Sequence, residues 1–162
     1  MDDALYLLAT EVGQALQSRG MMLATAESCT GGWVGEALTA VPGSSGWYER
    51  GFITYSNAAK HEMLDVATAT LAAFGAVSEP TVREMAAGAL QHSHAQIALA
   101  VSGIAGPGGG TAEKPVGSVW FAWGLAGGAL TSERRVFAGD RDTVRRQAVE
   151  AALKGVLALL KL

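Results

Sequence analysis

The sequence is poor in several residue types, and each shortage argues against a class of protein. Its 162 residues include one cysteine, so no internal disulfide can form and a reducing compartment is indicated. Charged residues make up 17% of the chain and the net charge is −3, which argues against a general nucleic-acid binder. No apolar run approaches the roughly 20 residues of a membrane span. The chain opens on two acids where a secretory signal has basic residues, so we expect a cytoplasmic protein without membrane or nucleic-acid partners.

Metal-binding patterns are also scarce. The histidines number three, and the pair His92 and His94 has no cysteine or acidic partner in its pattern, so we expect no metal. The four tryptophans lack the interleaved basic residues of a nucleic-acid stacking platform and are expected in the core or an interface. Together with an apolar hairpin near the C-terminus, they indicate a homodimer.

Apolar residues and glycine are abundant instead. Hydrophobic residues make up 49% of the chain, which argues against disorder, and 21 glycines are well above the usual share of about 7%. The length suits a single domain over residues 1–162. Helices are predicted over 3–19, 30–40, from 57 onward, 78–92 and 142–160, and strands over 21–26, 51–56, 96–103, 116–123 and 130–137. This order predicts a three-layer α/β/α sandwich with a mixed, mostly parallel sheet of about five strands, including a C-terminal antiparallel hairpin.

The segment "TAESCTGG" (25–32) introduces polar residues at the carboxyl end of a predicted strand, the edge where open α/β sheets bind ligands. Gly31 and Gly32 at the start of the next helix leave room for a close approach to the backbone. Free N–H groups there suit a phosphate or an oxyanion. Two alternatives stay open: Ser28 or Thr30 only caps the helix, or Cys29 is a nucleophile paired with a distant histidine.

The segment "TYSNAAK" (54–60) supplies a base for Ser28. With Asn57 as the N-cap, Lys60 is the third residue of a helix, where the helix dipole disfavours the ammonium form. Added burial would lower the pKa of the amine into the range of a general base. Tyr55, at its strand end, could relay or position a proton. The alternative is an ordinary surface lysine and a core tyrosine.

The segment "SGIAGPGGG" (102–110) follows another predicted buried strand and has few side chains and much free backbone. It matches neither the GxGxxG fingerprint nor the Walker A loop, yet its backbone can cradle a phosphate. The alternative is a merely flexible turn. Candidate phosphate partners elsewhere are Lys114, Arg141, Arg145 and Arg146.

Five motifs carry a family resemblance: "TAESCTGG", "GFITYSNAAK", "GAVSEPTVREMA", "VSGIAGPGGGTAEKPVG" and "GDRDTVRRQAV". In this order and over nearly the whole chain, they resemble the C-terminal domain of the competence-damage-inducible CinA-type proteins. The resemblance to stand-alone members of that family implies a nicotinamide-nucleotide amidohydrolase. Such an enzyme hydrolyses the carboxamide of nicotinamide mononucleotide to nicotinate mononucleotide and ammonia and so recycles a product of NAD breakdown. It also implies a serine nucleophile assisted by a lysine and a tyrosine, here Ser28, Lys60 and Tyr55.

The implied chemistry needs no metal or other cofactor. Neutral Lys60 takes the proton of Ser28, with Tyr55 in the relay, and N–H groups between Thr30 and Gly32 hold the oxyanion. Ammonia leaves as a serine ester forms, and water hydrolyses the ester. The small-molecule substrate is expected to contact Glu27, Thr30, Gly31, Gly32, Asn57, Ser102, Gly103 and Gly106.

Two alternatives to an enzyme stay open. One is a non-catalytic nucleotide-binding or regulatory module associated with competence or the DNA-damage response, in which Ser28 and the glycine loop bind phosphate without turnover. The other is a protein-interaction role linked to DNA uptake, although the acidity of the chain argues against direct DNA binding.

Overall fold

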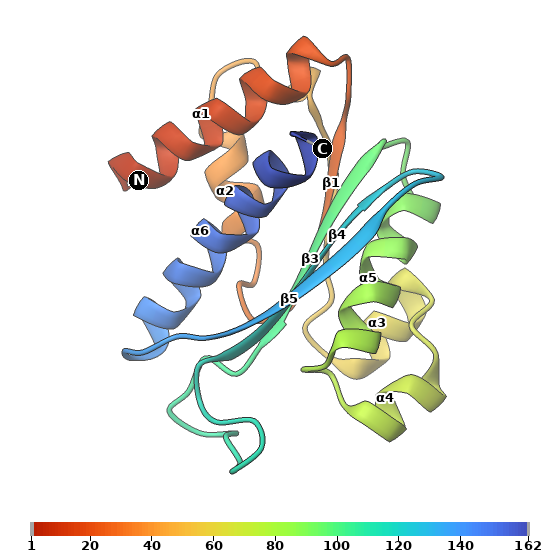
Figure 1. The fold of residues 1–162 in the computed structure, drawn as a ribbon, viewed down its shortest axis with the longest axis vertical. Helices are drawn as coiled ribbons and strands as arrows, with labels where there is room; N and C mark the ends of the chain where they lie inside the picture. The colour runs from red at the N-terminus through yellow and green to blue at the C-terminus, as the bar shows by residue number, and fades with distance from the viewer. Residues whose placement is uncertain (1, 162) are drawn as a thin grey trace.

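The computed structural model describes residues 2–161 and confirms the predicted three-layer α/β/α sandwich with a mixed sheet of five strands (Figure 1). In chain order the elements are α1 (Asp3–Ser18), β1 (Leu23–Glu27), α2 (Trp33–Thr39), the 3-10 helix η1 (Ser44–Gly46), β2 (Tyr48–Ile53), α3 (Asn57–Leu64), α4 (Thr68–Phe74), α5 (Glu79–Gln91), β3 (Ile97–Gly103), β4 (Ser118–Leu125), β5 (Leu130–Val136) and α6 (Arg141–Leu160). Within residues 2–161, no helix has both the length and the apolar character needed to cross a membrane.

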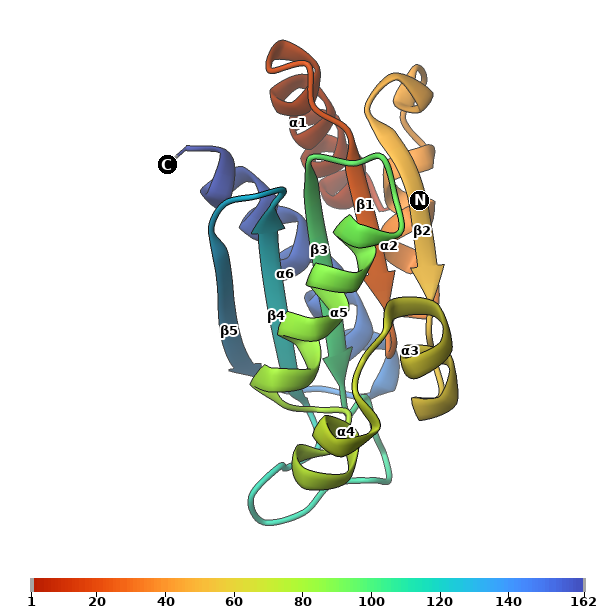
Figure 2. The same ribbon diagram turned by 90° about the vertical axis from the view of Figure 1, so that its right-hand side faces the viewer.

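The strand order β2-β1-β3-β4-β5 brings the ends of β1, β2 and β3 to one edge of the sheet. β1 pairs in parallel with both β2 and β3, whereas β4 is antiparallel to β3 and to β5. Four strands therefore run in one direction and β4 runs against them (Figure 2). β1 is buried along its whole length and β3 along all but its last residue, as strands covered by helices on both faces must be.

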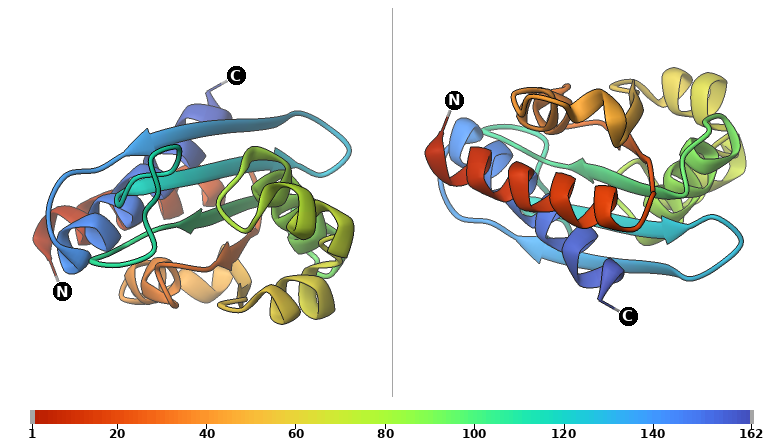
Figure 3. Two further views of the ribbon diagram at one scale, coloured as in Figure 1. Left: turned by 90° about the horizontal axis from the view of Figure 1, so that it is seen from below. Right: turned by 90° about the horizontal axis from the view of Figure 1, so that it is seen from above.

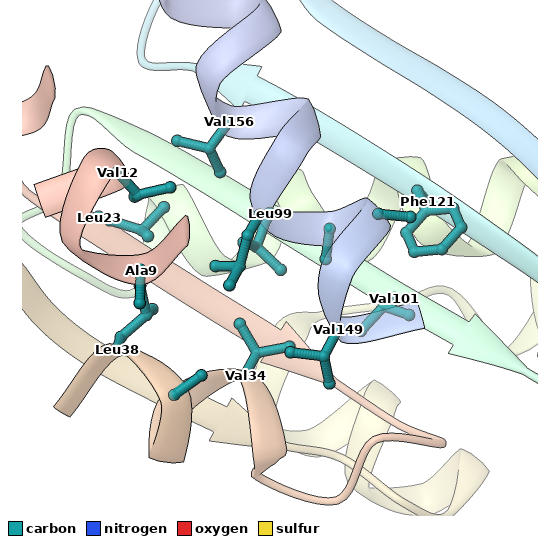
Figure 4. Packing of buried hydrophobic residues seen from close by; sticks show 14 of the residues in the cluster. Ala9, Val12, Leu23, Val34, Leu38, Leu99, Val101, Phe121, Val149 and Val156 are labelled. Atoms are coloured by element: carbon teal, nitrogen blue, oxygen red, sulfur yellow. The ribbon is translucent and has the colours of Figure 1, made fainter. Parts of the chain in front are cut away.

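The helices divide between the two faces of the sheet. α1, α2 and α6 cover one face and α3, α4 and α5 the other, and α1 and α6 lie side by side (Figures 1 and 3). Each face has its own apolar cluster. Figure 4 shows part of the larger cluster, including Val12, Leu23, Val34, Leu99, Val149 and Val156. The site described below lies at the edge of the sheet between these two layers.

A glycine allows α6 to approach the sheet closely. Gly155 lies against Trp123 of β4, and a Cβ atom at this position would stand 2.0 Å from the indole ring. The Trp123 indole N–H donates to the carbonyl of Ala152, 2.9 Å away, one turn earlier in α6. Trp123 and Trp47 are buried, in agreement with the expectation that tryptophans serve the core.

The structure shifts two predicted element boundaries near the site. α2 begins at Trp33 rather than at residue 30, because Gly31 and Gly32 have φ angles of +59° and +104°, which lie outside the helical region. β2 covers Tyr48–Ile53 rather than 51–56, so Tyr55 lies beyond the strand.

The helix that carries Lys60 also starts one residue earlier than predicted. Ser56, not Asn57, is the N-cap of α3, since its extended backbone lets its hydroxyl accept the N–H of Ala59 at 3.0 Å. Asn57 is thus the first helical residue and Lys60 the fourth. α4 was not predicted at all: it buries no residue and its N-cap, Ala67, has no capping side chain, so the sequence carries no periodic or capping signal for it.

Candidate functional site

A cavity of about 310 Å³ opens where the three sequence motifs meet at the edge of the sheet. Its lining includes Ser28 after β1, Tyr55 and Lys60 around the start of α3, residues of the segments 76–77 and 102–109, and Arg141 at the start of α6. The volume falls at the lower end of the range of about 300–1,000 Å³ found for small-molecule sites. The carboxyl ends of neighbouring strands therefore form a site for a small ligand.

Ser28 and Lys60 are in direct contact on the wall of this cavity. The Nζ atom of Lys60 lies 2.8 Å from the Oγ atom of Ser28 and 2.7 Å from the carbonyl oxygen of Thr54, with the carbonyl of Tyr55 at 3.5 Å. Helical side chains lean toward the N-terminus of their helix, so Lys60 reaches back beyond the start of α3 to these carbonyls. The backbone N–H of Ser28 donates to Val101 of β3 at 3.0 Å, which fixes the serine at the sheet edge.

The burial of Lys60 increases the fraction of neutral amine near neutral pH, although the ammonium form is still the larger fraction at pH 7. The side chain is 1% exposed, and burial lowers its pKa from 10.5 to about 8. No acidic side chain among residues 2–161 forms an ion pair with Lys60. A neutral amine has two N–H groups and one lone pair, which match two carbonyl acceptors and one hydroxyl donor.

The neighbouring Cys29 lacks the environment of a thiolate nucleophile. Burial raises the pKa of its thiol to about 11, so the sulfur is protonated near neutrality. No hydrogen bond joins Cys29 to a histidine anywhere in the described part of the chain. Of the two candidate nucleophiles, only Ser28 has a base beside it.

The Glu27 side chain is hydrogen-bonded to the start of α2 and does not line the cavity. It is 2% exposed, and its carboxylate accepts bonds from the Thr30 hydroxyl and from the N–H groups of Gly32, Val34 and Gly35. These are donors that the start of α2 would otherwise leave unpaired. Both carboxylate oxygens are thus occupied and Glu27 does not line the cavity, so these contacts do not support the prediction that Glu27 binds the substrate.

The backbone from Thr30 to Gly32 offers fewer free N–H groups than predicted. Gly31 donates to the carbonyl of Ser28 at 3.1 Å, and Gly32 donates to Glu27. Thr30 is fully buried, and neither it nor the two glycines lines the cavity. Within residues 2–161, the two N–H groups here without a hydrogen-bond partner are those of Cys29 and Thr30. Of these two residues Cys29 lines the cavity and Thr30 does not, so the N–H of Cys29 is the one available as an oxyanion donor.

Tyr55 lies at the mouth of the cavity, not between Ser28 and Lys60. Its side chain is 62% exposed, and its hydroxyl accepts a bond from Arg141 Nη2 at 3.1 Å. Arg141 Nη1 also donates to the carbonyl of Gly106 at 2.7 Å. The Tyr55 hydroxyl has no bond to Ser28 or Lys60 in the described chain, so the contacts support a role in positioning Arg141 rather than a proton relay.

Of the predicted substrate contacts, Ser102, Gly103 and Gly106 line the cavity, whereas Asn57 does not. Asn57 faces a separate surface hollow beside α4 and is exposed. The Ser102 side chain is 1% exposed, and its Oγ has no hydrogen-bond partner among the described residues. A buried hydroxyl without a partner at the wall of a cavity is available to a ligand.

The four candidate phosphate partners have different surroundings. Arg141 alone borders the cavity. Arg145 binds the carbonyls of Cys29 and Thr30, Arg146 pairs with Asp2 and Glu150, and Lys114 donates to the carbonyl of Phe74. Residues 2–161 contain no cluster of three or more His, Cys, Asp or Glu side chains that could hold a metal ion.

Sequence reasoning missed two kinds of contributor to the site. The carbonyls of Thr54 and Tyr55 are acceptors for Lys60, but a backbone group leaves no signal in the residue pattern. Ala76 and Val77 form an apolar part of the cavity wall, although they precede a helix and carry no reactive group. Their place in the cavity wall became evident only from the fold.

The chain matches proteins of known family over most of its length. The family model described as "CinA C-terminal domain" matches residues 6–160. A protein of Escherichia coli (strain K12) named nicotinamide-nucleotide amidohydrolase PncC is 57% identical over 153 residues, 94% of this chain and 93% of the relative. A protein of Pseudomonas putida with the same name is 52% identical, over 97% of this chain and 98% of the relative. The crystal structure of the competence/damage inducible protein CihA from Agrobacterium tumefaciens has a TM-score of 0.94 at 46% identity, covering 98% of this chain and 96% of that one.

Proposed function

The chain belongs to the CinA C-terminal domain family, and from this premise we propose that it is an amidohydrolase that converts nicotinamide mononucleotide and water to nicotinate mononucleotide and ammonia. Relatives that are over half identical across nearly the whole chain carry the name of this activity. The observation that carries the chemistry is the contact of 2.8 Å between Lys60 Nζ and Ser28 Oγ at the wall of the cavity.

In the first step Ser28 attacks the carboxamide carbon. Neutral Lys60 keeps its two N–H bonds to the carbonyls of Thr54 and Tyr55, and its lone pair takes the hydroxyl proton as the new C–O bond forms. The ammonium group then has three donors for the same three oxygen atoms. Proton transfer therefore requires no rearrangement of the amine, which keeps the barrier low.

The carbonyl oxygen of the substrate becomes negatively charged in this step. The unpaired N–H group of Cys29, which adjoins the nucleophile and belongs to a residue that lines the cavity, is the donor that we assign to it. Ser102, whose buried hydroxyl also lacks a partner, is the candidate for a contact with the carboxamide itself. Donors fixed in place before the reaction lower the barrier without a cost of reorganisation.

The proton on Lys60 then passes to the amide nitrogen, the C–N bond breaks, and ammonia leaves. A water molecule next gives a proton to Lys60 and attacks the ester carbon, and Ser28 recovers its proton as the C–O bond of the ester breaks. The product is a carboxylate, so one amine acts as base and as acid in both halves of the reaction.

The phosphate of the substrate needs a cationic partner at the mouth of the cavity. We assign this contact to Arg141, whose guanidinium borders the cavity and is held by Gly106 and Tyr55. Gly106, Gly108 and Gly109 also line the cavity and offer additional backbone donors.

An ammonia-release assay on wild type, Ser28→Ala and Lys60→Met tests the proposal. Each substitution should lower kcat by about 1,000-fold or more, since general-base catalysis alone contributes about 100- to 10,000-fold. Saturable binding of nicotinamide mononucleotide by the wild type without ammonia above the blank would instead indicate a non-catalytic nucleotide-binding module. Full activity of either variant would contradict the mechanism.

Several expectations from the sequence stay predictions: a single domain, a cytoplasmic location, a homodimer and the lack of nucleic-acid binding. Sedimentation velocity of the purified protein measures the oligomeric state. A binding assay with duplex DNA at several salt concentrations tests the expected lack of nucleic-acid binding, since true binding to phosphates weakens steeply with salt.

A further inference from the structure

We propose that Arg145 is a positioning residue that holds the turn after Ser28 and thereby keeps the Cys29 N–H, the donor that we assign to the oxyanion, in place. This inference rests on the proposed amidohydrolase function. Arg145 lies one helical turn after Arg141 in α6 but does not line the cavity. Any effect it has on the reaction must therefore pass through other groups.

Arg145 forms hydrogen bonds to the backbone immediately after the nucleophile. Its Nε atom donates to the carbonyl of Cys29 at 3.0 Å, and its Nη2 atom donates to the carbonyl of Thr30 at 3.1 Å. The guanidinium carbon lies 5.4 Å from the centre of the Trp33 ring, so the planar group stacks on α2 while it bridges the two carbonyls. A lysine at this position could not make both bonds in this fixed geometry.

The contacts fix the orientation of two successive peptide groups. In a trans peptide the C=O and N–H bonds point in opposite directions. The carbonyl of Ser28 is tied to the N–H of Gly31, so the N–H of Cys29 points the other way. The carbonyl of Cys29 is tied to Arg145, so the N–H of Thr30 points away from the guanidinium. Both of these N–H groups are without a partner within residues 2–161.

The charge of Arg145 strengthens this hold, because hydrogen bonds from a cation to a carbonyl are about twice as strong as those between neutral groups. A donor that is held in place matters most when negative charge develops on the substrate and little when the neutral carboxamide is bound.

Because Arg145 is expected to matter in the transition state and little in substrate binding, Arg145→Gln should lower kcat much more than it changes KM. The variant keeps a planar amide donor but loses the charge and one of the two bonds. We expect kcat to fall about 30- to 100-fold, below the 100- to 1,000-fold typical for complete removal of an oxyanion donor, with KM changed less than about threefold. Arg145→Lys keeps the charge with one bond, so its loss should be smaller, about tenfold.

The adjacent residue Arg146 provides a matched control. It lies in the same helix, pairs with Asp2 and Glu150, and neither lines the cavity nor bonds to the turn after Ser28. Arg146→Gln removes the same charge by the same substitution, and kcat should stay within about twofold of wild type because Arg146 contacts no group of the site. Thermal unfolding of all variants shows whether a loss of kcat follows from a loss of stability.

A second readout separates the oxyanion from simple substrate binding. A mononucleotide with an aldehyde in place of the carboxamide accepts Ser28 Oγ at its carbonyl carbon, while the serine proton passes to Lys60. The resulting hemiacetal oxyanion imitates the tetrahedral intermediate. In Arg145→Gln, the affinity for this aldehyde should fall by the same factor as kcat, whereas the affinity for the product nicotinate mononucleotide should stay within about threefold.

The outcomes are distinct. Parallel losses of kcat and aldehyde affinity, with product affinity and Arg146→Gln unaffected, support the positioning role. A kcat of Arg145→Gln within threefold of wild type, or equal losses of aldehyde and product affinity, would overturn it while the amidohydrolase function stands. If wild type releases no ammonia from nicotinamide mononucleotide, the proposed function fails first, and the inference about Arg145 fails with it.

Discussion

The segments that follow β1 and β3 start alike but are held very differently. Both follow a buried strand, both are rich in glycine, and both line the same cavity. The backbone of residues 27–32 is held by Glu27 on its N–H side and by Arg145 on its carbonyl side. The loop 104–117 projects beyond the sheet, and its cavity-lining part has one side-chain bond, from Arg141 to Gly106 (Figure 1).

Because the two segments are held so differently, we expect them to have different roles in the reaction. Atoms that react must be held within a fraction of an ångström, so the serine, its base and the oxyanion donors belong on the rigid segment. The parts of a substrate that bind without reacting can be contacted by a loop whose conformation adjusts to them. We therefore expect changes after β1 to affect kcat and changes around the β3 loop to affect KM.

The sharpest way to break this comparison is Glu27→Gln. The glutamine amide would present an N–H₂ group to donors that now bind a carboxylate, so at least one buried N–H would lose its acceptor, at a cost of about 1–3 kcal/mol in unfolding free energy. With the start of α2 loosened, kcat should fall about 100-fold and KM should change little. Steady-state kinetics together with denaturant unfolding measure both effects. Unchanged kcat at a lowered stability would show that this scaffold does not position the nucleophile.

Arg141→Gln tests the adaptable side of the cavity. Loss of the cation at the mouth should raise KM about tenfold, because a charge-assisted bond to phosphate is worth about 1.5–3 kcal/mol in a partly exposed site, and kcat should change less than about threefold. Competition by inorganic phosphate should weaken in parallel. A fall in kcat at constant KM would show that Arg141 acts on the reaction step, which would contradict the division between kcat effects after β1 and KM effects around the β3 loop.

Cys29→Ala should have the smallest effect, although Cys29 adjoins the nucleophile. Its thiol stays protonated near neutrality because burial raises the thiol pKa to about 11, and the N–H that we assign to the oxyanion is retained by alanine. We expect kcat/KM within about threefold of wild type, less than about 1 kcal/mol in barrier. A hundredfold loss of kcat/KM in the same ammonia assay would instead indicate that Cys29 is the nucleophile.

The sequence predicted the elements whose signals are local. The helix at residues 3–19 with its apolar stripe, the Ser78 cap of α5, the buried β3 and the C-terminal hairpin were all predicted correctly. The approach of Lys60 to Ser28 was also predicted, because the ends of neighbouring parallel strands share one edge of the sheet.

The predicted substrate contacts that the cavity does not match have a common physical origin. Glu27, Thr30 and Asn57 were expected to contact substrate because their types suit that task. In the structure Glu27 and Thr30 are hydrogen-bonded to each other, and Asn57 lies on a different exposed face. Arg145 was classed with three other cations, and only the packing of α6 on the turn after β1 distinguishes it. A residue type indicates what a side chain can do, and the fold decides which partner it meets.

Direct titration of Lys60 tests the central claim. The protein has four lysines, so carbon-13 labelling at lysine Cε gives few NMR signals, and Lys60→Met assigns the one of interest. The account predicts a pKa near 8 for Lys60, with kcat/KM rising about tenfold per pH unit below that value and levelling above it, since the neutral amine is the base. A Lys60 pKa at or above the ordinary 10.5, with kcat/KM independent of pH between 6 and 8, would contradict the account.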